Sequence, residues 1–145
     1  MVEYWYLEKK QWIYYPWQLL VALPFFESVR AWNPQSPVDE LVDHIHIESY
    51  LIDHPVSSVL LSVKGDSMQD AWLQEGDVLV VDKALQAKWW DIVIAIVDNE
   101  YTVKYLEKTS DWRRYLKPWN SAYDDIYPED SLEIFGVVTW SFRKY

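Results

Sequence analysis

Cysteine is absent from this 145-residue chain, and glycine occurs only at Gly65, Gly76 and Gly136. The lack of cysteine excludes disulfide bonds, thiolate zinc sites and a cysteine nucleophile. All three glycines lie in the second half of the chain, whereas residues 1–55 hold no glycine and five prolines. The composition therefore indicates two regions of different character.

Long apolar segments are also absent. The longest apolar run in the N-terminal part, Leu19–Phe26, is far shorter than the roughly 20 residues that a membrane-spanning helix needs. Glu3 and Glu8 stand where a secretory signal carries basic residues, and no small-residue cleavage site follows them. We therefore expect no membrane segment and a cytoplasmic location, which also argues against a membrane signal peptidase.

Basic residues are scarce, with 13 Lys and Arg against 23 Asp and Glu, so the formal net charge is −10. A chain of this charge repels a phosphate backbone, and we expect no direct binding to duplex DNA. Arg113 and Arg114 form a local basic pair, but two arginines are more often a solvated face. DNA could still be approached through a partner.

Hydrophobic residues make up 50% of the chain, which is enough for the core of one domain. We interpret residues 1–38 as an N-terminal arm and linker, and residues 39–145 as the domain. Within the arm, Trp17–Val29 is expected to hold a short helix broken at Pro24. Ala31–Val38 is expected to be extended, because each proline disfavours the helical conformation of the residue before it.

The pattern after the arm is mainly β. His44, His46 and Glu48 alternate with isoleucines, which favours a strand at 44–48. Short strands at regular spacing indicate a compact antiparallel β-sheet or barrel. Five further strands are predicted, at Ser57–Val63, Asp77–Val81, Asp91–Val97, Glu100–Leu106 and Leu132–Phe142.

The environment of Lys104 follows from a predicted hairpin. Asp98–Asn99 suits a two-residue turn, and that turn places Val93 opposite Lys104 and Ala95 opposite Thr102. An amine among apolar atoms loses its charge more easily, and a neutral lysine can take a proton from a hydroxyl. The hairpin alone also permits the more common arrangement, a lysine on an outer face with its stem along the sheet.

A candidate nucleophile follows the first predicted strand of the second half. Ser67 lies after Gly65 in the segment Gly65–Met68, and a glycine turn can expose a serine hydroxyl beside free backbone N–H groups. A Gly-Asp-Ser triplet alone is usually only a turn.

The ordered combination of motifs is more specific than either residue. Together the blocks resemble the S24 peptidase family, in particular its LexA/UmuD-like members, over about Pro24 to Phe142. The blocks are VKGDSM at Val63–Met68, EGDVLVVDK at Glu75–Lys83, DIVIAIVDNEYTVKYL at Asp91–Leu106, Leu116 with Pro118 and Asn120–Tyr123, and LEIFGVV at Leu132–Val138.

This resemblance implies a β-fold of the LexA/UmuD C-terminal type with an N-terminal arm, and a serine–lysine autopeptidase activity. Ser67 would attack a peptide bond in the chain's own arm or in the arm of a dimer partner. Lys104, uncharged, would act as general base. The backbone N–H groups of Asp66 and Ser67 would form the oxyanion hole. No metal or organic cofactor is implied.

The resemblance also implies a cellular role and partners. Family members of this kind act in the SOS response, where a RecA–single-strand DNA filament stimulates self-cleavage. The product, as a homodimer, is then the accessory subunit of an error-prone translesion DNA polymerase, a UmuC-like member of the Y family.

The candidate cleavage site departs from the family pattern. The family cuts between a small residue and glycine, and the matching dipeptide here is Ala31–Trp32. Glycine adopts backbone angles that other residues avoid, so Trp32 is expected to slow or abolish cutting. The alternative is a cleavage-deficient, dimeric binding module that regulates a polymerase or RecA.

Overall fold

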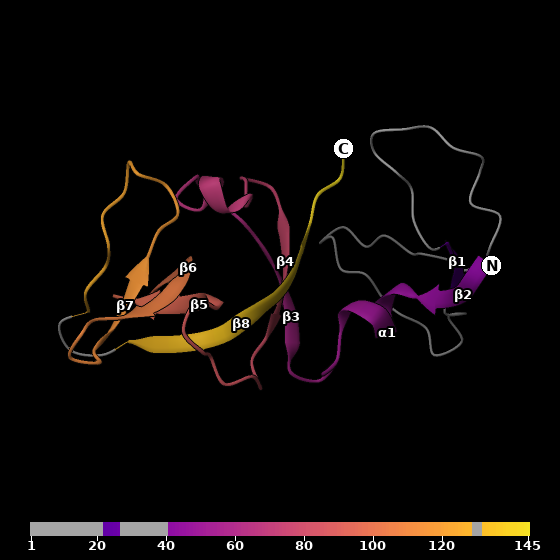
Figure 1. The fold of residues 1–145 in the computed structure, drawn as a ribbon, viewed down its shortest axis with the longest axis horizontal. Coiled ribbons are helices and arrows are strands. Elements are labelled where there is room, and N and C mark those ends of the chain that lie inside the picture. The colour runs from indigo at the N-terminus through magenta and orange to yellow at the C-terminus, as the bar shows by residue number, and fades with distance from the viewer. Residues whose placement is uncertain (1–21, 27–40, 129–131) are drawn as a thin grey trace, which may run out of the picture. The chain divides into compact units, whose positions relative to one another are not determined.

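The structure is a computed structural model, which describes residues 22–26, 41–128 and 132–145. It divides into two compact units, Met1–Tyr50 and Leu51–Tyr145. Within the described residues, no helix is both long and apolar enough to cross a membrane. Each unit is taken by itself, and Figure 1 gives the element labels.

The first unit contains a pair of antiparallel strands. β1 (Ala22–Phe26) pairs with β2 (Leu41–His46), with Pro24 opposite His44. The helix expected across Trp17–Val29 is therefore wrong at residues 22–26. Proline lacks the N–H and the space that a helix interior needs, but it is tolerated in a strand that has a free edge.

The strand expected at 44–48 is confirmed only as far as His46, because the short helix α1 (Ile47–Leu51) begins at the next residue. The expected linker Ala31–Val38 lies outside the described residues.

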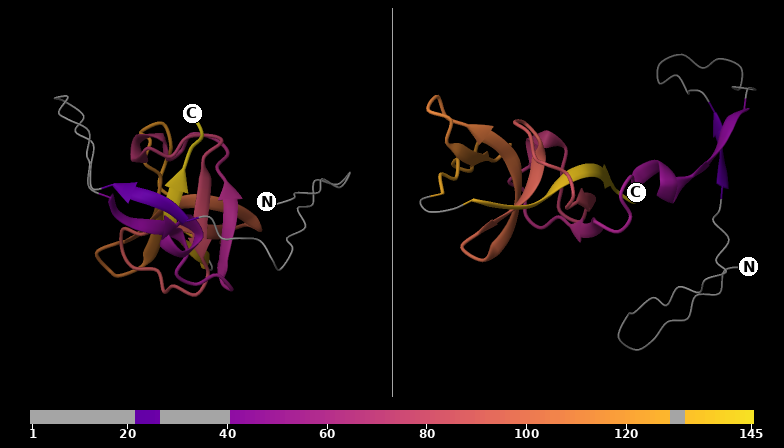
Figure 2. Two further views of the ribbon diagram at one scale, coloured as in Figure 1. Left: turned by 90° about the vertical axis from the view of Figure 1, so that its right-hand side faces the viewer. Right: turned by 90° about the horizontal axis from the view of Figure 1, so that it is seen from below.

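The second unit is a six-stranded antiparallel sheet with the order β3-β4-β8-β5-β6-β7, and the views in Figure 2 show how its strands twist. The mainly β prediction is confirmed. The strands are β3 (Ser58–Ser62), β4 (Val78–Asp82), β5 (Ile92–Val97), β6 (Glu100–Lys108), β7 (Arg114–Lys117) and β8 (Glu133–Phe142), with a short 3₁₀ turn at Gln69–Ala71.

Strand β7 was missed because its four residues, RYLK, are too short to show an alternating pattern. Strand β8 is last in the chain but lies inside the sheet, between β4 and β5.

Strand β5 separates two buried clusters and is buried on both faces, as its continuous apolar run predicts. Ile94 packs with Met68, Leu79 and other residues on one side, whereas Val93 and Ala95 pack on the other. Burial of this kind contributes roughly 1.5–3 kcal/mol for each large apolar side chain. Both faces of β5 are therefore fixed by packing, and so is the strand that pairs with it.

An ion pair between a buried carboxylate and a more exposed arginine joins the segment after β8 to the turn before β4. Asp77, only 2% exposed, accepts hydrogen bonds from Arg143 Nε at 2.5 Å and Nη2 at 2.6 Å. The backbone N–H of Gln74 donates to the same carboxylate at 2.8 Å, so Asp77 also holds the turn that leads into β4. The Arg143 hydrogen bonds, more than any other cause, hold the pKa of Asp77 below its usual range.

We predict that Arg143→Ala lowers the melting temperature by roughly 10 °C, because a buried carboxylate then has no counter-charge. Arg113→Ala is the matched control, since Arg113 forms an exposed ion pair with Asp111; it should change the melting temperature by less than about 3 °C. Thermal unfolding followed by circular dichroism measures both. Equal effects would contradict the assigned role of the buried pair.

Candidate active site

Ser67 lies in a turn between β3 and the 3₁₀ turn at Gln69–Ala71, half buried above the core. The turn is possible because Gly65 adopts a φ of +78°, which side-chain-bearing residues rarely reach. Met68, 1% exposed, anchors the turn in the core. Within the described residues, the backbone N–H groups of Asp66 and Ser67 have no hydrogen-bond acceptor, so both are available to an incoming oxygen atom.

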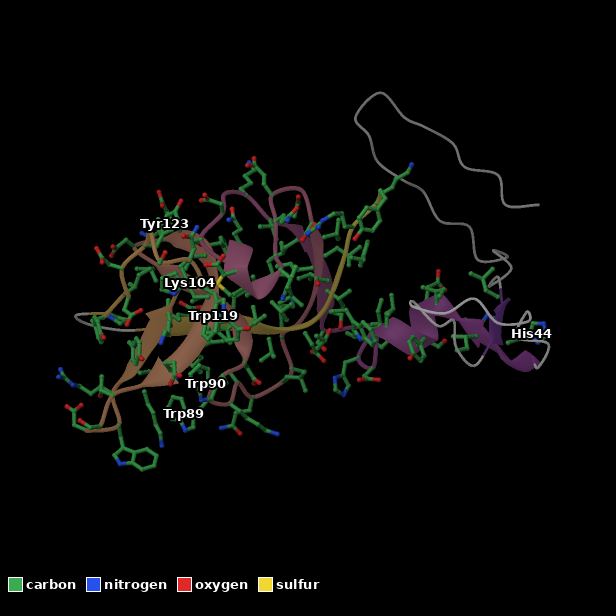
Figure 3. All side chains as sticks on the ribbon, turned by 45° about the horizontal axis from the view of Figure 1, so that its top comes forward. His44, Trp89, Trp90, Lys104, Trp119 and Tyr123 are labelled. Carbon is green, nitrogen blue, oxygen red and sulfur yellow. The ribbon has the colours of Figure 1, made fainter. Side chains whose placement is uncertain are left out.

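A distant loop holds this turn in place (Figure 3). The backbone N–H of Trp119 donates to the Ser67 carbonyl at 2.9 Å, and Asn120 Nδ2 donates to the Asp66 carbonyl at 2.9 Å. The Tyr123 hydroxyl donates to the Asp66 carboxylate. The sequence marked Asn120–Tyr123 as a motif but gave it no role. Its contacts identify Trp119, Asn120 and Tyr123 as residues that position the Ser67 turn.

Lys104 lies in the middle of β6 with the predicted register, since Val93 is opposite Lys104 and Ala95 is opposite Thr102. It is 6% exposed, which excludes the outer-face arrangement. Its Nζ atom lies 2.8 Å from Ser67 Oγ, 2.8 Å from Thr102 Oγ1 and 3.0 Å from the carbonyl oxygen of Val103. The structure therefore brings Ser67 and Lys104, 37 residues apart, into direct contact.

The surroundings of Lys104 favour the uncharged amine. Burial lowers the pKa of Lys104, and no carboxylate in the described ranges forms an ion pair with it. A neutral amine has two N–H groups and one lone pair. Thr102 Oγ1 and the Val103 carbonyl can accept the two N–H groups, and the lone pair can then accept the Ser67 O–H. The three contacts thus satisfy the neutral form in full.

An apolar cleft of about 420 Å³ opens beside Ser67. Strand β3 borders it and is an edge strand among the described residues, so one side of its backbone lacks a strand partner there. An extended peptide could pair with that edge and reach Ser67. The cleft is lined by Leu61, Ser62, Val63, Lys64, Ser67, Leu79, Ile94, Tyr101, Thr102, Val103 and Phe135.

Two other sequence expectations concern the site. The candidate cleavage site, Ala31–Trp32, lies outside the described residues. No group of three or more His, Asp or Glu side chains within the described part of the chain is arranged to hold a metal ion. Thr102, whose contact with the amine was not foreseen, faces the same way as Lys104 because the two residues are two positions apart in one strand.

Comparisons with known proteins agree on one family. Residues 24–139 match the family described as Peptidase S24-like. The chain is 41% identical to protein SamA of Salmonella typhimurium over 83% of this chain and 84% of SamA. It is 36% identical to protein MucA of Escherichia coli over 86% of both chains. It is also 34% identical to the LexA repressor of Clostridium novyi, over 87% of this chain and 62% of the repressor.

We predict that Lys104 titrates below the value of about 10.4 typical of lysine in water. Thr102→Val should lower the pKa of Lys104 further, because the charged ammonium then loses one acceptor for its three N–H groups. Carbon-13 NMR of labelled lysine side chains measures this, with Lys104→Met to assign the signal. Thr139→Val, a strand threonine bonded to the Val80 carbonyl, is the control and should leave the signal unchanged. A Lys104 signal titrating at or above the aqueous value would contradict the prediction.

Proposed function

We propose a function for this chain from one premise, which is that it belongs to the Peptidase S24-like family. The chain is a serine–lysine autopeptidase that cuts a peptide bond in its own N-terminal arm or in the arm of a dimer partner, with Ser67 as nucleophile and Lys104 as general base. The contact of 2.8 Å between Ser67 Oγ and a buried, weakly basic amine carries this proposal. Removal of either side chain tests it.

The first chemical step forms an acyl-enzyme. Ser67 Oγ attacks the carbonyl carbon of the scissile bond while its proton passes to the lone pair of Lys104 Nζ. The negative charge on the carbonyl oxygen is held by the backbone N–H groups of Asp66 and Ser67, which have no acceptor within the described residues. The Lys104 ammonium then donates that proton to the leaving amine, and the bond breaks.

The second step restores the enzyme. Lys104, again neutral, takes a proton from a water molecule that attacks the ester formed with Ser67. As the ester breaks and releases the new carboxyl end, the Lys104 ammonium returns that proton to Ser67 Oγ. Thr102 and the Val103 carbonyl hold the amine through both steps. The arm would enter the cleft as an extended segment beside β3, since that edge is unpaired in the described sheet.

The cellular role that we propose is that of a UmuD-like SOS response protein. A RecA–single-strand DNA filament stimulates self-cleavage, and the shortened homodimer serves an error-prone, UmuC-like Y-family polymerase in translesion synthesis. The similarity to SamA and MucA, which extends over most of each chain, supports this role. Exposed apolar side chains such as Leu60 and Phe142 offer surface that a homodimer would bury.

A second candidate function is a UmuD-like binding module that has lost useful cleavage and regulates a polymerase or RecA as a dimer. Trp32 favours it, because the family places glycine at that position and a tryptophan there restricts how the arm can bend. The two candidates share the fold and differ only in whether the arm is cut.

We predict that alkaline pH promotes self-cleavage. The neutral amine is the reactive form, so the rate should rise with pH and level off above the lowered pKa of Lys104. Ser67→Ala and Lys104→Met should each abolish the cut, whereas Ser110→Ala and Lys144→Met should retain it. Gel analysis and mass spectrometry of incubated protein measure this. A cut that persists in Ser67→Ala protein would rule out the proposed nucleophile.

We predict that Trp32→Gly speeds Ser67-dependent cleavage between residues 31 and 32 by at least about tenfold, because it removes the side chain that hinders the bend. The two proteins are compared with and without RecA on single-stranded DNA. If Trp32→Gly is cut and the natural sequence is not, the natural protein is the binding module. If neither protein is cut under any of these conditions, the autopeptidase proposal is wrong.

A further inference from the structure

A band of tryptophans and lysines lies on the second unit outside the Ser67–Lys104 contact. Its members come from the segment before β5, from β6 and from both ends of β7, so the fold gathers them from separate parts of the chain. We call it the tryptophan–lysine band; it consists of Trp89, Trp90, Tyr105, Lys108, Trp112, Lys117 and Trp119.

Each lysine of the band lies near two tryptophan rings. Lys108 Nζ lies 3.1 Å from the ring centroid of Trp112 and 5.4 Å from that of Trp89. Lys117 Nζ lies 6.0 Å from the centroid of Trp90 and 5.8 Å from that of Trp119. Each ammonium therefore sits beside two aromatic rings, which cation–π attraction favours.

The rings are ordered yet exposed. Trp119 packs against Trp90 and Tyr105 with centroid distances of 6.3 and 5.0 Å. Trp90 remains 56% exposed and Trp112 69%. Figure 3 labels Trp119, Trp90 and Trp89 in succession below Lys104. The band thus presents pre-positioned aromatic surface to solvent.

Backbone geometry does not set the band apart from the rest of the surface. Trp90 and Trp112 adopt φ angles of +71° and +66°, in the left-handed region where glycine or asparagine is preferred. Trp72, outside the band, adopts the same conformation with a φ of +66°. What distinguishes Trp90 and Trp112 is that each has a lysine ammonium beside its ring.

The two lysines of the band, Lys108 and Lys117, form no ion pair among the described residues. The nearby Asp111 is already paired with Arg113 at 2.8 Å. Asp70 and Asp125 line a shallow hollow together with Lys117 but do not pair with it. In a chain of net charge −10, two free ammonium groups between aromatic rings mark a local site for an anion that also has flat faces.

We propose that the tryptophan–lysine band binds single-stranded nucleic acid. Unpaired bases stack on the exposed tryptophans, and phosphates contact Lys108 and Lys117, which is the combination used by proteins that bind single strands without sequence preference. A duplex hides its base faces inside the stack, so it offers only the phosphates to an acidic protein and binds poorly. The proposal does not rest on the chemistry of Ser67 and Lys104.

Fluorescence anisotropy of a labelled thymidine oligonucleotide of about 16 residues tests this on the full chain, in about 50 mM salt. Trp90→Asn and Trp112→Asn should each weaken binding about tenfold, because one stacking face is lost. Asparagine tolerates positive φ, so these variants keep the fold, and a melting curve verifies it. Trp72→Asn is the matched control, since Trp72 is 85% exposed with a φ of 66° but has no ring or lysine contact among the described residues; it should bind as the natural protein does.

The lysines are tested through the salt dependence of binding. Lys108→Ala and Lys117→Ala should each reduce the slope of log affinity against log salt by about 0.7, the value for one phosphate contact on a single strand. Lys144→Ala should leave the slope unchanged, and so should Ser67→Ala, which separates this proposal from the peptidase proposal. Three outcomes would overturn the proposal. The natural protein does not bind the oligonucleotide, the Trp90 and Trp112 variants bind it as tightly as the natural protein does, or the natural protein binds a duplex as tightly as the single strand.

Discussion

The site depends on one buried amine that has no counter-charge. Lys104 is 6% exposed, and no carboxylate among the described residues pairs with it, so its environment favours the neutral form. Asp77 is also buried, but its charge is balanced, because Arg143 donates two hydrogen bonds to its carboxylate. Pairing stabilises the charged form of a buried group, whereas isolation lowers the pKa of Lys104 and so favours the uncharged amine beside Ser67.

The lowered pKa of Lys104 bears on the proposed chemistry only because the Ser67 hydroxyl is held against the amine. Its position is set from two directions: the packed core fixes β5 and hence the register of β6, and the loop at Trp119–Tyr123 fixes the turn that carries Ser67. Neither element alone brings the two groups to 2.8 Å. The geometry of the site is thus a product of the whole second unit, although only a few atoms would react.

Much of this arrangement could be predicted from local signals. Asp98 and Asn99 both adopt positive φ, as a two-residue hairpin turn requires, so their side-chain types were enough to give the register at Lys104. Contacts between residues far apart in the sequence leave no local sequence pattern, so they were not predicted. The bonds from Asn120 to Asp66 and from Arg143 to Asp77 span 54 and 66 residues. The helix expected around Pro24 failed because apolar runs of that length do not distinguish strand from helix.

The Ser67–Lys104 contact is made within one chain. That chain supplies strand β6, the Ser67 turn and the loop that holds the turn by hydrogen bonds. Each copy of the fold therefore carries both side chains of the Ser67–Lys104 contact. A single substitution at Ser67 or Lys104 would therefore remove the contact from that copy alone and leave it intact in every other copy.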